Sequence, residues 1–161
     1  MNDNNCSSGL IGSTETYSVT GGKYSSTISQ LDADNKALAE ANTTGQTYAN
    51  DIGDCLTKVS FFNNGYPGKV TSVTFFTPKK NYTFTPNANG DVGVNGIMYV
   101  PLGECRIEIN MTSPTEPGDF YMSYRGGSAN ICEPVYNGYA TRDNIVITSS
   151  YNSIVISDYC E

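Results

Sequence analysis

The sequence predicts a mainly β protein, in which an antiparallel, jelly-roll-like β-sandwich follows a small module of one β-hairpin and one amphipathic α-helix. Three observations predict this fold. Residues 56–161 hold about eight short β-rich stretches separated by Gly, Pro and Asn, which is typical of a sandwich. One stretch, residues 29–52, has helical periodicity instead. Charged residues make up only 16% of the 161 residues, and 16 Gly and 12 Tyr favour turns and exposed sheets.

The N-terminal module, residues 1–55, is predicted to begin with a hairpin. Residues 13–28 alternate between β-favouring and small polar side chains, and Gly21 and Gly22 interrupt them where a tight turn needs positive φ. The period then changes to that of a helix. Ser29 is a good N-cap, and Gly53 is a plausible C-cap.

The predicted helix has one apolar face. At 100° per residue this face is about 100° wide, and it carries Leu31, Leu38, Ala41, Gly45, Tyr48, Ala49 and Ile52. The stretch "NTTG" at 42–45 is a weak point where the helix could break or kink. A hairpin and one helix bury too little to be stable alone, so the module must dock on a partner or be cross-linked. We therefore predict interface roles for Leu31, Leu38 and Tyr48.

The second region, residues 56–161, is predicted to be the sandwich. In "RIEIN", Ile107 and Ile109 point inward while Arg106 and Glu108 point outward, which indicates one solvated sheet face. The "FF" pairs at 61–62 and 75–76 are expected to place one ring inside and one outside, or at a partner interface, and Phe61 and Phe76 are the interface candidates.

The five cysteines are Cys6, Cys55, Cys105, Cys132 and Cys160. None forms a CxxC pair, and the chain has no His, so a metal site is not expected. The odd number leaves at least one thiol unpaired or intermolecular. Cys6 and Cys55 bracket the front module and are the preferred disulfide. The alternative is five buried free thiols in a reducing compartment.

The front module carries an ordered set of motif residues. They are Tyr17, Val19, Gly22, Tyr24 and Ser26, then Ser29, Gln30, Ala33 and Asp34, then Gly45, Gln46, Tyr48, Ala49 and Asn50, and finally Cys55. Over about 45 residues this pattern resembles a short domain of unknown function that recurs in large surface proteins of Bacteroidetes and in some proteins of their phages. The resemblance implies a setting outside the cell or on a virion, and it implies no chemistry.

Charge and hydropathy exclude several classes of function. The net charge is −7, and a negative chain repels phosphate backbones, so nucleic-acid binding is not expected. No apolar stretch approaches the ~18 residues of a membrane span. The first ten residues lack the basic start and apolar run of a signal peptide. We expect either that a signal has been removed or that the protein leaves the cell as a virion component does, on lysis.

Candidate chemistry is sparse. Without His, most catalytic triads are excluded, although a pair of scattered acids could still hydrolyse glycosides. Asn87, Asn89 and Asp91 occupy positions 1, 3 and 5 of a calcium-like loop, but position 12 is Met98 instead of Glu, so an ordinary turn is the better interpretation. Tyrosines beside Gly-rich turns suggest ligand contacts, although many should only cover the core. These candidates are Tyr121, Tyr124, Tyr136 and Tyr139.

The sequence therefore predicts a non-enzymatic structural or interaction protein of an extracellular or virion assembly. A phage head fibre, decoration or tail protein and a Bacteroidetes surface filament all fit. The expected partners are proteins, either copies of the same chain in a homo-oligomer or other subunits, and we expect no cofactor and no membrane insertion. The alternatives are a secreted carbohydrate-binding or adhesin-type module and, third, a glycan hydrolase.

Overall fold

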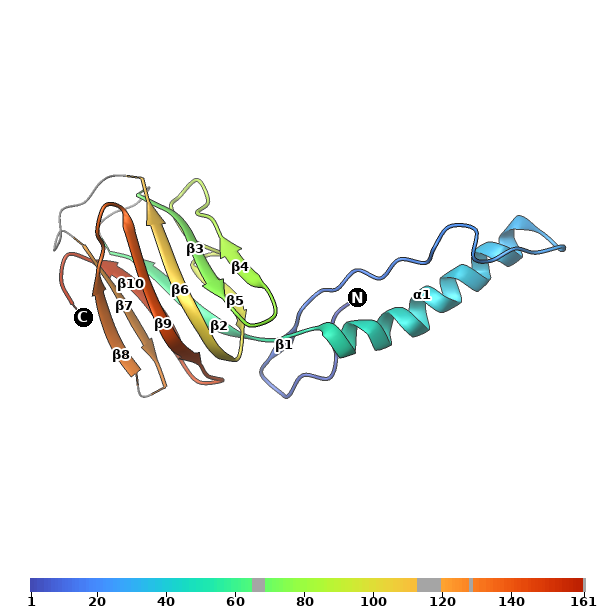
Figure 1. Cartoon of the computed structure of the whole chain (residues 1–161), viewed down its shortest axis with the longest axis horizontal. Coiled ribbons are helices and arrows are strands. Elements are labelled where there is room, and N and C mark those ends of the chain that lie inside the picture. Colours follow the sequence, from blue (N-terminus) through green and yellow to red (C-terminus); the bar gives the residue numbers. More distant parts are fainter. Residues whose placement is uncertain (65–68, 113–119, 128, 161) are drawn as a thin grey trace. The chain divides into compact units, whose positions relative to one another are not determined.

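The computed structural model describes residues 1–64, 69–112, 120–127 and 129–160. The chain divides into two compact units, Met1–Leu56 and Thr57–Glu161, a boundary one residue from the predicted one. The predicted fold class is confirmed, because two β-sheets form a sandwich-like body and the described chain has one helix (Figure 1). The stretch "NNGYPG" at 63–68, whose Gly, Pro and Asn residues are typical of a turn, lies largely outside the described residues.

Unit 1 is built on helix α1, Gln30–Ile52. The Ser29 side chain accepts a 3.2 Å hydrogen bond from the backbone N–H of Asp32, so the predicted N-cap forms. Gly53 is the C-cap, but its φ of −63° is not left-handed. Glycine is needed there for space, since a Cβ would lie 2.5 Å from the Ala49 carbonyl oxygen and 2.6 Å from the Asp3 Cβ.

The break that the sequence allowed at 42–45 does not occur, because α1 runs through these residues without interruption. Gly45 is buried because the N-terminal segment lies close against it, where an added Cβ would lie 2.9 Å from the Met1 Sδ and 3.3 Å from the Tyr17 Cβ. The buried stripe of α1 consists of small residues at four-residue spacing, which lets an extended chain approach the helix backbone. Ala33, Gly45 and Ala49 of this stripe are buried, and Ala37 and Ala41 are half-buried.

Of the hairpin predicted at 13–28, the turn is present but the two strands are not. Lys23 N–H donates to the Thr20 carbonyl at 3.2 Å, and Gly22 has φ +78°, so the chain reverses there. The flanking residues form no β-ladder with each other. They run beside α1 instead (Figure 1), and their side chains bond to the helix. The strand β1, Ile11–Gly12, lies in this unit and pairs with the first two residues of β2, Cys55–Asn63.

Unit 2 consists of two sheets. The first has the strand order β2-β10-β7-β8, with β5 also paired to β2, and the second has the order β4-β3-β6-β9. The pairs β10–β7, β7–β8, β3–β4, β3–β6 and β6–β9 are antiparallel, and the pair β2–β10 is parallel. The strands are β2 Cys55–Asn63, β3 Val70–Phe76, β4 Asn81–Phe84, β5 Ile97–Pro101, β6 Gly103–Met111, β7 Tyr121–Gly126, β8 Ala129–Pro134, β9 Tyr139–Ile147 and β10 Asn152–Ser157.

The core of unit 2 is formed by alternate residues of both sheets. Ile107 and Ile109 are fully buried while Arg106 is exposed, as the alternation predicts. Each "FF" pair also divides as predicted, with Phe61 and Phe75 buried. The interface role predicted for Phe61 is therefore wrong, because its ring belongs to the core and its neighbour Phe62 is the exposed one.

Tyr124 is a buried core residue, which corrects its prediction as a ligand contact. Its hydroxyl donates to the Asn152 Oδ1 at 3.0 Å and lies 3.2 Å from the Val146 carbonyl oxygen. Burial raises the pKa of this hydroxyl to about 12. Asn152, itself buried, also donates to the Ser150 and Thr148 carbonyls, so one polar cluster fixes the start of β10.

Two disulfides cross-link the chain, one in each unit. Cys6–Cys55 closes unit 1, which is the pairing preferred from sequence. Cys132–Cys160 joins β8 to the end of the chain and was not predicted. The fifth cysteine, Cys105, is a free buried thiol. The alternative of five free thiols does not hold for this structure.

Candidate functional site

Besides the exposed apolar side chains of α1, three features of the described residues have geometry that could serve a function: a carboxylate cluster and a cystine-carboxylate contact in unit 1, and a shallow hollow in unit 2. The first lies at Glu40, in the middle of α1. The hydroxyls of Tyr17 and Tyr24 donate to its two carboxylate oxygens, each at 2.6 Å. The Lys23 ammonium lies 2.6 Å from the second oxygen. Three side chains of the extended segment therefore converge on one acid.

The cluster at Glu40 favours the ionised carboxylate. Hydrogen bonds from Lys23, then Tyr17 and Tyr24, hold the pKa of Glu40 at about 2. The same hydrogen bonds raise the pKa of each tyrosine hydroxyl and of the Lys23 ammonium. With this low pKa, the Glu40 carboxyl group is a poor general acid at neutral pH, because it carries no proton to donate. We interpret the cluster of Glu40, Tyr17, Tyr24 and Lys23 as a clasp that fixes the extended segment on the helix.

The second feature is Asp3, which is buried beside the Cys6–Cys55 disulfide. Its Oδ1 accepts a 2.9 Å hydrogen bond from the backbone N–H of Asn5. Its Oδ2 lies 3.6 Å from the Cys6 Sγ and 3.8 Å from the Cys55 Sγ. Sulfurs joined in a disulfide carry no hydrogen, so neither contact is a hydrogen bond. Among the described residues, Oδ2 thus has no hydrogen-bond donor.

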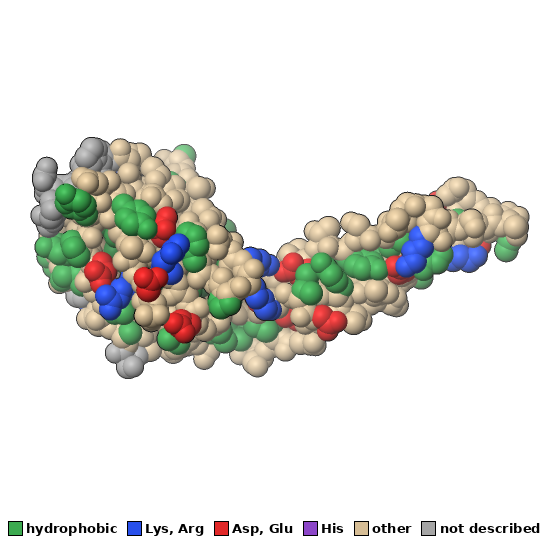
Figure 2. All heavy atoms as spheres, viewed as in Figure 1, with side chains coloured by type: hydrophobic (Ala, Val, Ile, Leu, Met, Phe, Trp, Pro, Cys, Tyr) green, Lys and Arg blue, Asp and Glu red, His purple; other side chains and the backbone are tan. Residues whose placement is uncertain are grey.

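Large apolar side chains are exposed on unit 1. Leu31 is 68% exposed and Leu38 is 59% exposed, and their seven-residue spacing places them on one side of α1, two turns apart. Ile28, just before the N-cap, is 82% exposed. Figure 2 shows hydrophobic side chains reaching the surface along this helix. Tyr48 is 39% exposed and its ring centroid lies 5.6 Å from that of Tyr17, so Leu31 and Leu38 are the more accessible of the interface residues predicted on α1.

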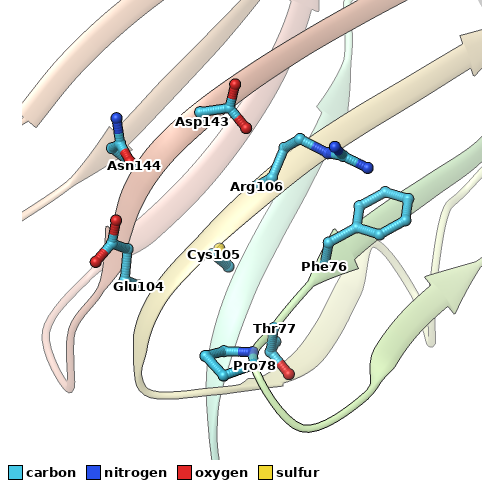
Figure 3. A pocket seen from close by; sticks show the side chains of 8 residues that line it. All are labelled: Phe76, Thr77, Pro78, Glu104, Cys105, Arg106, Asp143 and Asn144. Carbon is cyan, nitrogen blue, oxygen red and sulfur yellow. The ribbon is translucent and has the colours of Figure 1, made fainter.

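The third feature is a shallow hollow of about 350 Å³ on the outer face of the four-stranded sheet (Figure 3). Arg106 stacks on the Phe76 ring, with its guanidinium carbon 4.0 Å from the ring centroid. Glu104 and Asp143 contribute carboxylates from the neighbouring strands β6 and β9 (Figure 3). Acidic and basic side chains also lie side by side over these strands (Figure 2). Cys105 is also among the lining residues, and burial raises the pKa of its thiol to about 12.

The other predicted tyrosines are dispersed. Tyr139 is 40% exposed and its hydroxyl donates to a Glu108 oxygen at 3.0 Å. Tyr136 is exposed, and Tyr121 is half-buried on β7 of the other sheet. Since the tyrosines lie on different sheets, they do not form one binding platform. Phe76, predicted as an interface residue, is one of the residues that line the hollow.

The calcium-like loop is organised by its own hydrogen bonds. The Asn87 Oδ1 accepts from the backbone N–H groups of Asn89 and Asp91 at 2.8 and 3.1 Å. The Asn87 amide also donates to the Asp91 carboxylate at 3.3 Å. This is the turn that the sequence favoured over a cation site, because the Asn87 oxygen caps the backbone.

Comparison with known proteins gives a family match for the N-terminal unit. Residues 1–56 match a family of unknown function, DUF5977, which corresponds to unit 1. The matched region is about a third of the chain. No curated protein and no solved structure shows significant similarity. The match agrees with the resemblance seen in the motif residues in one respect: both identify a domain of unknown function over this region.

Sequence reasoning missed two residues in unit 1, Glu40 and Asp3. Glu40 lies off the predicted apolar face, and only the turn at Gly22 brings Tyr17 and Tyr24 to it. The signal for Asp3 was the short spacing to Cys6, which places a carboxylate beside any disulfide that Cys6 forms. Of the part of the chain that the structure describes, no helix is both long and apolar enough to span a membrane.

Proposed function

We propose that this chain is a non-enzymatic structural or interaction protein of an assembly outside the cell, in which unit 1 is the docking module and the sandwich is the exposed body. The observation that carries the proposal is the exposure of Leu31 and Leu38 on a helix that buries small residues instead. A helix normally buries its large apolar side chains. Here the extended segment covers the Ala/Gly stripe and leaves the leucines for a partner.

The cross-links support a location outside the cell. Disulfides persist in oxidising environments, and each unit has one. Unit 1 has only Ala33 and Ala49 as buried hydrophobic residues among the described positions. It therefore depends on its cystine and its polar clasp for stability, as small secreted domains commonly do. We place the chain on a virion or a bacterial surface, in phages of Bacteroidetes or in those bacteria themselves.

The proposed partner is a protein, first of all a second copy of the same chain. Exposed apolar side chains on one helix side fit a helix or groove of similar spacing. The experiment is light scattering of the oxidised full chain over a range of concentrations, beside a Leu31→Ser/Leu38→Ser variant. We expect a concentration-dependent oligomer that the variant loses. A matched Val94→Ser variant, at an exposed apolar residue of unit 2, should leave the mass unchanged.

A second candidate function is glycan binding on the outer face of the four-stranded sheet. The observation that favours it is the hollow of Figure 3, where an aromatic ring, a guanidinium and two carboxylates share one concave surface. The guanidinium and the carboxylates can hydrogen-bond sugar hydroxyls. A glycan array with the wild-type chain and an Arg106→Ala variant tests it. Binding that the variant loses would support this candidate, and no bound glycan would argue against it.

A further inference from the structure

The feature of unit 1 that its fold leaves unexplained is the Asp3 carboxylate. Asp3 is 6% exposed, and its Oδ2 is directed at two sulfur atoms that cannot donate a hydrogen bond. A buried carboxylate oxygen without a donor costs free energy, and such groups normally have a partner. The disulfide form of unit 1 does not supply one.

We propose that Asp3, Cys6 and Cys55 form a binding site for a thiophilic divalent cation, of the Zn²⁺ class, in the thiol form of the chain. The chain is synthesised with thiols, so this form exists before any disulfide is made. The metal ion and the disulfide would then be two alternative ways of linking Cys6 to Cys55 in unit 1. The inference is independent of the proposed assembly, since no residue of the site belongs to the exposed face of α1.

The distances fit a tetrahedral site. With Zn–S of ~2.3 Å and Zn–O of ~2.0 Å, a sulfur and an oxygen bound to the same ion lie ~3.5 Å apart. The two contacts of the Asp3 Oδ2 are already 3.6 and 3.8 Å. All three ligand atoms lie within 4.8 Å of one another. Only the two sulfurs must separate, to ~3.8 Å, once they are no longer bonded.

The chemistry of the ligands also fits. Two thiolates and one carboxylate suit Zn²⁺, whose fourth position a water molecule can fill. The Asn5 N–H holds Oδ1 at 2.9 Å, which leaves Oδ2 as a single oriented ligand atom, as outer hydrogen bonds commonly do in metal sites. On binding, each thiol loses its proton to solvent and forms one metal–sulfur bond, so two protons are released for each ion.

The experiment uses the full chain in which Cys132 and Cys160 are replaced by Ser, so that the second pair cannot bind metal. A water-soluble phosphine reduces Cys6–Cys55: the phosphine becomes its oxide with the oxygen of one water, whose two hydrogens go to the thiols. The reduced chain is titrated with Co²⁺ as a spectroscopic probe and then with Zn²⁺ in competition. We expect a 1:1 complex with thiolate-to-cobalt absorption, which Zn²⁺ abolishes.

Two variants separate the proposed site from adventitious binding. Asp3→Asn keeps the size of the side chain and its carbonyl acceptor, and it should weaken Co²⁺ binding by at least about tenfold. Cys6→Ser should abolish the thiolate absorption. Formation of the Cys6–Cys55 disulfide in oxidised Asp3→Asn shows that this variant still folds. Equal affinity in Asp3→Asn, absorption retained in Cys6→Ser, or no complex at all would overturn the proposal.

Discussion

The Tyr17 hydroxyl donates a 2.6 Å hydrogen bond to the Glu40 carboxylate, and this joins the first tyrosine of the N-terminal motif to the middle of α1. Tyr24 makes the equivalent bond to the other carboxylate oxygen. Two motif tyrosines, seven residues apart on either side of a turn, thus meet one acid. The motif is explained by a clasp on the helix, where the sequence alone had suggested a hairpin.

The clasp predicts that Glu40→Gln loosens the extended segment without unfolding the sandwich. Glutamine keeps the size of the side chain but loses the charge that Lys23 and both hydroxyls bind. Hydrogen exchange should become faster over residues 15–28 and stay unchanged in β6 and β10. Asp51→Asn is the control, because it removes an exposed carboxylate of the same helix outside the clasp. Equal protection of residues 15–28 in wild type and Glu40→Gln would contradict the clasp.

The same cluster predicts the acid response of unit 1. The folded pKa of Glu40 is about 2, below the ordinary ~4.3 of glutamate. The clasp therefore contributes its full stability above pH ~4.3, and this contribution is lost as pH falls through about 2. Tyrosine ring signals in NMR should report the loosening. A Tyr17 signal unchanged from pH 5 to below 2 would argue against this.

An alkaline response is expected as well. The folded pKa of Lys23 is raised, so its contribution is fully present below the ordinary lysine pKa and is lost as pH rises through the folded value. The raised pKa values of Tyr17 and Tyr24 act in the same direction. Lys23→Met should remove the ammonium contribution and lower the alkaline midpoint of unit 1. An unchanged midpoint would show that the ion pair contributes nothing there.

Glycine substitutions test the close packing in unit 1. A Cβ at Gly12 would lie 1.6 Å from the Asp3 carbonyl oxygen, which is backbone and cannot move cheaply. Gly12→Ala should therefore destabilise unit 1 and expose the Cys6–Cys55 disulfide to reduction. Gly21→Ala is the matched control, since nothing lies within 4 Å of its Cβ position. Equal rates of reduction for the two variants would contradict the packing described here.

The second disulfide should contribute measurable stability to unit 2. Cys132 and Cys160 are 28 residues apart, and closing a loop of that length is worth about 3–4 kcal/mol in the chain-entropy model. Cys132→Ser/Cys160→Ser should lower the free energy of unfolding of the sandwich by that amount in chemical denaturation. Cys105→Ala is the control for the loss of a cysteine that is not cross-linked. A change below about 1 kcal/mol in the double variant would show that the cross-link is not structural.

Much of the fold follows from the sequence because local rules agree with the tertiary structure. Ile107 and Ile109 alternate with Arg106 on a half-solvated sheet, and Ser29 caps the helix, as predicted. The prediction failed where a long-range contact decided the outcome. Residues 13–28 have β character, but their side chains form hydrogen bonds with α1 in place of a β-ladder. Phe61 is buried in a core that includes strands far along the chain, such as β10.

The candidate sites were less accessible from sequence. Glu40 and Asp3 gain their roles from contacts with residues that the turn at Gly22 and the Cys6–Cys55 bond bring near. The exposure of Leu31 and Leu38 also depends on which face of α1 the extended segment covers. Helical periodicity identified an apolar face but could not show that the buried stripe would consist of Ala and Gly.

The most direct test of the central claim is the molar mass of the oxidised full chain in solution at rising concentration. The proposal predicts a mass above that of the monomer, which falls to the monomer value when Leu31 and Leu38 are replaced by Ser and stays unchanged in Val94→Ser. A wild-type chain that remains a strict 17.3 kDa monomer at the highest concentration would contradict self-assembly through α1.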